Sequence, residues 1–364
     1  MAISVRDPQQ RTTRNTLRRY WLGWGLVILI LTVLALTLDL GEVVAAFARV
    51  DPAQLVAILL LMTLDRLIMA WKWSMLLRAV GVNLPLTTII RYYYQGTLSG
   101  TFLPSQVGGD VLRGYWVSQA TGSPHAVFAS VVMEKVIGIL SAVTFAIVGI
   151  VVLACLAYSK GSWSWIALGV SALIAVNGAF FLSMRPAVHD FVLRRLRRWE
   201  GVKLFGLLHR LYEAYARFTN APGALCANLL ITHAEQALQI AVTLLVAHSL
   251  GITAGISTTA FLAVSAIYLM IYRIPISPDN WGVGELTAIG VFGLIGIKAE
   301  AAFSFTFLAH ILQVVVVLPG LLFLLQSPYR ATRRPTVTLA GAGEPAAEVC
   351  VEPSTIAGGP RQQI

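Results

Sequence analysis

Ionisable side chains inside long apolar stretches are the residues of this sequence best able to do chemistry. Placing a charge in the core of a bilayer costs on the order of 2.5 to 3.5 kcal/mol, so such a residue usually faces a partner or a wet cavity. Asp65 and Lys72 are seven residues apart and share one face of a helix, with Arg66 beside them. The three side chains either pair with one another or face a substrate cavity, and the spacing allows both.

A second set of candidates surrounds a pair of glycines. Gly108 and Gly109 precede Asp110, and Arg113 follows three residues later. If a helix begins at the glycines, its free N–H groups can bind an anion, and the guanidinium can make a bidentate contact with phosphate. A local ion pair between Asp110 and Arg113 explains the same spacing, so anion binding and pairing remain alternatives.

Further acids and bases are scattered through the apolar stretches. Glu134 and Lys135 are adjacent and cannot face each other, so each needs another partner. Glu235 is a candidate cavity residue, whereas the nearby His233 is interpreted as packing. Glu285 follows two glycines, where the helix dipole favours an acid whether or not that acid has another function.

The composition identifies the kind of protein that holds these residues. Of the 364 residues, 57% are hydrophobic and 12% are charged, against roughly 25% charged in soluble domains. A soluble protein, a disordered chain and a disulfide scaffold are excluded, the last because there are only three cysteines. The net charge of +10 lies between apolar blocks, which argues against nucleic acid as a partner. The chain is therefore predicted to be an all-α polytopic membrane protein.

Six apolar blocks are long enough to cross a bilayer, which takes about 20 residues. They are residues 21–38, 55–77, 126–156, 163–184, 224–250 and 303–325. A cleaved signal peptide is the alternative for the first block, but that block is too long for a typical signal and is followed by acids.

Two further stretches, residues 86–122 and 253–297, are interrupted by polar, proline and glycine residues, and the second interruption begins at Arg273. We predict helix-break-helix elements, either re-entrant or full hairpins, because a freed backbone at membrane depth needs protein or water as its partner.

The two halves, residues 21–157 and 163–327, repeat one order of span, span, broken element and span. The breaks share a spacing, since Gly108 follows Pro104 by four residues and Gly282 follows Pro278 by four, with an acid next in each case. Starting from opposite sides of the membrane, the halves form an inverted repeat, which is typical of secondary transporters.

Positive charge orients the chain in the membrane. Arginines gather before residue 21, in residues 185–217 and after residue 327, whereas the opposite loops carry little positive charge. The positive-inside rule therefore predicts a cell (inner) membrane protein with both termini in the cytoplasm. Residues 1–20 form a basic cytoplasmic segment, residues 185–220 an amphipathic cytoplasmic segment, and residues 328–364 a disordered cytoplasmic tail.

Motifs of nucleotide hydrolysis, metalloprotease chemistry and serine nucleophiles are missing from the sequence. The histidines occur singly, so neither a metal site nor a cofactor is predicted. We expect no enzymatic activity, and any transport would be downhill or driven by a gradient.

One block carries a family resemblance. Residues 102–113, FLPSQVGGDVLR, resemble the P-x-x-x-G-[GE]-[DE]-x-x-R block of the lysylphosphatidylglycerol synthase transmembrane-region family, and residues 70–81, 132–135 and 276–285 are similar to three further family segments in order. The resemblance implies a lipid-translocating domain like that of the multiple peptide resistance factors, without their aminoacyltransferase domain.

The sequence departs from the family pattern at three places. Lys135 stands for the usual arginine, and residues 279–281 replace common glycines. Gly284 stands where an arginine often precedes the acid, which leaves Glu285 without its usual ion-pair partner.

The leading functional hypothesis is a flippase that moves an anionic, aminoacylated or other lipid-linked substrate between leaflets. The alternative is a non-catalytic lipid-binding partner of a lipid- or envelope-modifying enzyme, and a membrane-embedded transferase is a third reading. The predicted substrate-binding residues are Asp65, Arg66, Lys72, Pro104, Gly108, Gly109, Asp110, Arg113, Glu134, Lys135, Glu235, Arg273, Pro278, Gly282 and Glu285.

Overall fold

The computed structural model describes residues 24–103, 106–157, 162–183, 185, 217–218 and 221–326, and over these ranges every regular element is a helix. The all-α prediction is confirmed. The basic N-terminal segment 1–20, the tail 328–364 and nearly all of the amphipathic segment 185–220 lie outside the described residues.

Within the described residues, five helical segments are long and apolar enough to cross a membrane. They are α3 (Pro52–Ala79), α6 (Pro124–Ala157), α7 (Ser162–Ser183), α10 (Pro222–Ser249) and the pair α13 (Ala299–Val317) with α14 (Pro319–Gln326). A sixth candidate is the helix Trp24–Thr37 together with α2 (Leu40–Phe47), which are bent by 96°. Exposed apolar side chains such as Leu168 and Ile174 cover α7, as a lipid-facing helix requires.

Local sequence explains where several of these helices begin. Proline occupies the first turn of both α3 and α10, where its missing N–H costs nothing. The Asp51 carboxylate caps α3 by accepting from the N–H of Ala53 at 3.1 Å. Asp39 caps α2 in the same way, and this new helix start produces the bend after Thr37.

The first broken element consists of α4 (Leu86–Phe102) and α5 (Gln106–Thr121), which pack closely against each other. Glycines make the close approach possible. A Cβ added to Gly96 would lie 2.9 Å from the Gly109 carbonyl oxygen, and one added to Gly109 would overlap the Gly96 carbonyl. The hairpin thus depends on small residues at the helix contact.

The second broken element consists of α11 (Thr258–Tyr272), the short 3-10 helix η1 (Pro278–Asn280) and α12 (Val283–Gly293). Between the two α-helices the backbone turns through left-handed conformations at Asp279 (φ 45°), Asn280 (φ 58°) and Gly282 (φ 76°). The Asn280 amide donates to the Tyr272 carbonyl and so ties the break to the end of α11. Both predicted interruptions are therefore real breaks between helices.

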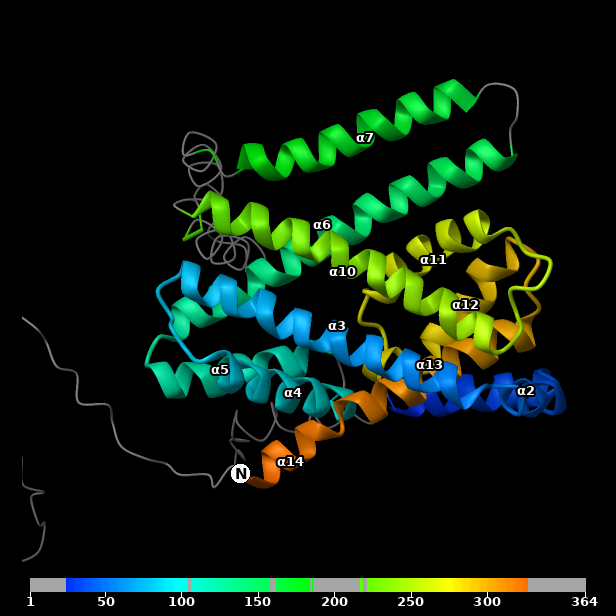
Figure 1. Cartoon of the computed structure of the whole chain (residues 1–364), viewed down its shortest axis with the longest axis horizontal. Coiled ribbons are helices and arrows are strands. Elements are labelled where there is room, and N and C mark those ends of the chain that lie inside the picture. Colours follow the sequence, from blue (N-terminus) through cyan, green and yellow to red (C-terminus); the bar gives the residue numbers. More distant parts are fainter. Residues whose placement is uncertain are drawn as a thin grey trace, which may run out of the picture. The chain divides into compact units, whose positions relative to one another are not determined.

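The two halves repeat one arrangement. α3 and α10 are both 28 residues long and pack against each other. Asp65 lies 13 residues after Pro52 in α3, and Glu235 lies 13 residues after Pro222 in α10. α11 packs on α6, while α4 packs on α13 and α14, so each broken element contacts the last long helix of the other half. In Figure 1 the element α4–α5 lies toward the left end of the long helices and α11–α12 toward the right end, as an inverted repeat requires.

An aromatic cluster holds the second broken element in place. The Phe292 ring on α12 lies 5.1 Å from Phe261 and 5.5 Å from Tyr268, both on α11. It also lies 4.8 Å from Phe305 on α13. These ring contacts fix α11, α12 and α13 as one packed unit beside the site.

Candidate functional site

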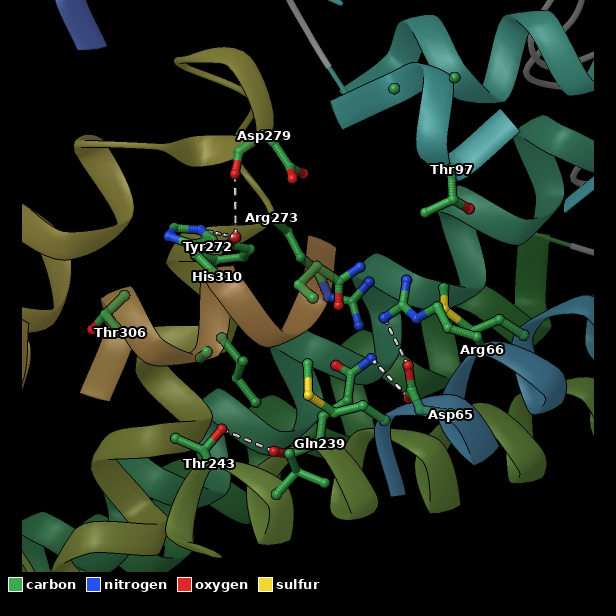
Figure 2. Close-up of a pocket in the computed structure, with 18 of the residues that line it drawn as sticks. Asp65, Arg66, Thr97, Gln239, Thr243, Tyr272, Arg273, Asp279, Thr306 and His310 are labelled. Carbon is green, nitrogen blue, oxygen red and sulfur yellow. Dashed lines mark hydrogen bonds and ion pairs between the residues drawn. The ribbon is translucent and has the colours of Figure 1, made fainter. Parts of the chain in front are cut away.

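A cavity of about 290 Å³ lies between the two halves of the repeat. Its lining residues come from α3, α4, α5 and α6 of the first half and from α10, α11, η1 and α13 of the second (Figure 2). Six charged residues line it, three acidic and three basic: Asp65, Asp110, Asp279, Arg66, Lys135 and Arg273. The cavity can therefore satisfy both an anionic and a cationic group of one ligand.

Asp65 and Arg66 form an ion pair on α3, with 2.7 Å between Oδ2 and the guanidinium. Gln239 on α10 joins this pair to the second half, because its amide donates to Asp65 at 3.2 Å (Figure 2). The same amide also donates to Glu235 at 2.8 Å. The two acids at equivalent positions of α3 and α10 thus meet at one amide group. The Nε atom of Arg66 is buried and has no hydrogen-bond partner among the described residues.

Lys72 does not pair with Asp65, although both lie on one helix face. Its ammonium forms a buried ion pair with Glu235 on α10, and Asn228 donates to its backbone carbonyl at 2.9 Å. Neither Lys72 nor Glu235 lines the cavity. Both are nearly inaccessible, so this pair ties α3 to α10 beneath the cavity.

Arg113 lies in a buried cluster of two acids and two aromatic rings. Its guanidinium lies 2.9 Å from Asp110 and 2.5 Å from Glu134, and it stacks between the rings of Trp73 at 4.3 Å and Tyr93 at 4.7 Å. Arg113 is only 1% exposed and is not part of the cavity lining. The structure therefore has the Asp110–Arg113 pair, enlarged by Glu134 into a buried cluster.

Asp110 also connects this cluster to the cavity. Its second oxygen lies 2.6 Å from the ammonium of Lys135 on α6, and the Lys135 side chain is 52% exposed. Glu134 and Lys135 thus have different partners, as their adjacency predicts. Of these residues, Asp110 and Lys135 line the cavity.

Arg273 reaches the cavity from the end of α11. It donates to the Gln236 side chain at 2.6 Å. Its positive charge is repelled by that of Arg66. Figure 2 shows the two side chains approaching the same part of the cavity from α3 and from the second break. Two guanidinium groups in one cavity are a common arrangement for binding phosphate or carboxylate.

The second break holds a cluster that the sequence analysis did not find. Glu285, which is 0% exposed, lies 2.6 Å from Nδ1 of His310 on α13. His310 Nε2 lies 2.6 Å from the Tyr272 hydroxyl, and the Trp281 ring stacks on the imidazole at 4.5 Å. His310 therefore serves as the partner of Glu285, in place of the arginine that the family pattern has where this sequence has Gly284.

One spacing could have revealed this partner. Asp110 on α5 pairs with Lys135 on α6, and Glu285 on α12 pairs with His310 on α13, so in each half the base follows the acid by 25 residues. The acid at the start of the second half-helix thus contacts the next long helix in both repeats.

Most of the remaining predicted residues shape the backbone and do not line the cavity. Gly109 lines the cavity, whereas a Cβ on Gly108 would meet the Leu103 side chain. Pro278 is buried at the start of η1, and Gly282 takes a positive φ against Ile30. Pro104 lies outside the described residues.

Three residues that line the cavity were not predicted from the sequence: Gln239, Tyr272 and His310. A neutral polar residue inside an apolar helix has no charge or spacing that would distinguish it in the sequence. His233 contacts Leu229 and Phe145 and lies outside the cavity lining. Within the described ranges, no group of three or more His, Cys, Asp or Glu side chains could hold a metal ion.

Comparison with known proteins gives one family. The profile described as the lysylphosphatidylglycerol synthase TM region matches residues 20–320. A UPF0104 membrane protein of Pyrococcus horikoshii is 20% identical over 76% of this chain and 88% of its own length. A UPF0104 membrane protein of Methanothermobacter thermautotrophicus is 19% identical over 80% of this chain and 87% of its own.

Proposed function

The chain belongs to the lysylphosphatidylglycerol synthase transmembrane-region family, and from that premise we propose that it binds the headgroup of a membrane lipid in its cavity and moves the lipid between leaflets. The role is transport rather than catalysis. The observation that carries the proposal is the cavity between the halves, with three acidic and three basic residues in its lining.

The mixed charge of the lining favours a headgroup that bears both phosphate and an amine. Arg66 and Arg273 offer donors to phosphate oxygens, while Asp65 and Asp279 offer acceptors to an ammonium group. An aminoacylated phospholipid has both groups. At about 290 Å³ the cavity can take a headgroup but not two acyl chains, so the chains would remain in the bilayer.

The repeat supplies a route for movement. Both halves contribute to one cavity, and their broken elements lie at opposite ends of the long helices (Figure 1). In the proposed mechanism both broken elements are re-entrant, the termini are cytoplasmic, and rocking of one half against the other opens the cavity to each leaflet in turn.

Reconstitution tests this proposal. Purified protein in liposomes should accelerate the leaflet exchange of a labelled aminoacylated or anionic phospholipid. Arg66→Gln or Arg273→Gln should weaken lipid binding, about tenfold in Kd for each 1.4 kcal/mol lost, and should slow the exchange. Arg78→Gln, an exposed arginine outside the cavity, is the matched control.

Wild-type protein that binds these lipids without exchanging them would contradict the transport role. That result would favour the alternative, a non-catalytic lipid-binding partner of an envelope-modifying enzyme.

A further inference from the structure

The buried pair Glu285–His310 has a feature that headgroup binding does not use. Glu285 is fully buried, its Oε2 has no hydrogen-bond partner among the described residues, and its Oε1 faces the imidazole. With neutral histidine the pair carries a net charge of −1 in an apolar setting, and with one added proton it is neutral. Burial disfavours that net charge, and Oε2 has no hydrogen-bond donor among the described residues to compensate for it.

A hydrogen-bond chain joins this pair to the cavity. Tyr272, Asp279 and His310 all line the cavity, and the Tyr272 hydroxyl lies between His310 Nε2 at 2.6 Å and the backbone carbonyl of Asp279 at 3.3 Å. Figure 2 shows Tyr272 beside His310 with its contact to Asp279. Because His310 and Tyr272 both line the cavity, a proton can pass between cavity water and the buried pair at the imidazole or through the tyrosine hydroxyl.

The hydroxyl has one hydrogen and cannot donate to both neighbours. When His310 is protonated, its Nδ1–H donates to Glu285, its Nε2–H donates to Tyr272, and the tyrosine donates to Asp279, so every contact is satisfied. When His310 carries only the Nδ1 proton, Tyr272 donates to Nε2 and the Asp279 carbonyl loses this donor. Asp279 has left-handed backbone geometry, so its contacts affect the shape of the break.

The repeat offers an internal comparison. The equivalent pair in the first half is Asp110–Lys135, whose base is a lysine and whose lysine side chain is half exposed. A lysine keeps its charge near neutral pH, whereas a histidine can change its charge there. The titratable base and the full burial occur together only in the second of these two pairs.

We propose that Glu285 and His310 form a proton-binding site, and that proton occupancy at this site controls the contact between Tyr272 and the second break. The other titratable groups around the pair are Tyr268 and Tyr272 on α11, which both interact electrostatically with Glu285. Asp279 on η1 and Arg66 on α3 in turn act on Tyr272. The ligand is a proton taken from cavity water, and the site would allow a pH gradient to bias the conformation of the break.

Trp281 is a built-in reporter, because its ring stacks on His310 and an imidazolium quenches indole fluorescence more strongly than neutral imidazole does. The protein in detergent, without added lipid, should show a reversible titration of its fluorescence as the pH is varied. Trp281→Phe identifies this signal among the nine tryptophans. His310→Gln should abolish the titration, and Glu285→Gln should move its midpoint to lower pH, because an amide does not stabilise the imidazolium. His248→Gln, an exposed histidine, is the matched control and should leave the titration unchanged.

Tyr272→Phe should keep the titration but uncouple it from the break, measured as loss of the pH dependence of protease or hydrogen-exchange protection at residues 277–282. A folded wild-type protein with no Trp281 titration, or a titration that survives His310→Gln, would overturn the proposal. Because no lipid is present, this result is independent of the transport assay, and failure of either proposal leaves the other intact.

Discussion

At the scale of residues, the buried Arg113 cluster favours a structural role for that arginine. Arg113 is paired with Asp110 and Glu134 and is stacked between two rings. The arginine itself does not line the cavity. Removing one member of a buried pair leaves an uncompensated charge, which costs about 3 to 5 kcal/mol. Breaking this cluster should therefore lower stability before it alters lipid binding.

We expect Arg113→Gln to lower the free energy of unfolding by about 3 to 5 kcal/mol, because the buried Glu134 loses its cation and Asp110 keeps only Lys135. The double change Arg113→Gln/Glu134→Gln should be milder, since Asp110 keeps its pair with Lys135 and no buried charge is left unpaired. Thermal unfolding in detergent measures both. If this double variant folds normally but no longer exchanges lipid, Arg113 belongs to the substrate site and its structural role is wrong.

The pair Lys72–Glu235 gives a second residue-scale prediction. Lys72→Met should destabilise the protein because Glu235 then keeps only its bond to Gln239. Lys72→Met/Glu235→Gln should recover most of the loss, and a double-mutant cycle of unfolding free energies measures the coupling. Additive effects of the two single changes would show that the pair does not join α3 to α10.

At the scale of elements, the α4–α5 hairpin depends on two glycines. Gly109→Ala should push α5 away from α4, because the added methyl would overlap the Gly96 carbonyl. Overpacking of this kind costs about 1 to 3 kcal/mol. Gly290→Ala on α12 is the matched control, since an added Cβ there has no neighbour within 4 Å. Equal melting temperatures for the two variants would mean that the hairpin does not require this close approach.

At the scale of the whole molecule, topology follows from the parity of the spans and the distribution of arginine. Arg78 lies in the last turn of α3, and Lys298 is the N-cap of α13. In a background without native cysteines, Arg78→Cys should label only from the cytoplasmic side and Lys298→Cys only from outside, as measured with an impermeant maleimide on intact cells. Labelling from the same side would contradict both the six-span count and the inverted repeat.

The sequence by itself determined the elements of this protein. Apolar runs of about 20 residues specify the long helices because a bilayer or a packed bundle requires that length. Proline predicts the breaks between α4 and α5 and between α11 and α12, because it has no N–H to continue a helix. The acids and bases inside these runs marked the region of the cavity, and six of the predicted residues line it: Asp65, Arg66, Gly109, Asp110, Lys135 and Arg273.

Only the tertiary structure decided which charges meet. Lys72 shares a face with Asp65 but pairs with Glu235, 163 residues away, because the packing of α3 on α10 places that carboxylate closer. Glu285 pairs with His310 because α12 packs on α13. The choice of partner depends on how separate helices pack against one another, and periodicity within one helix carries no information about that packing.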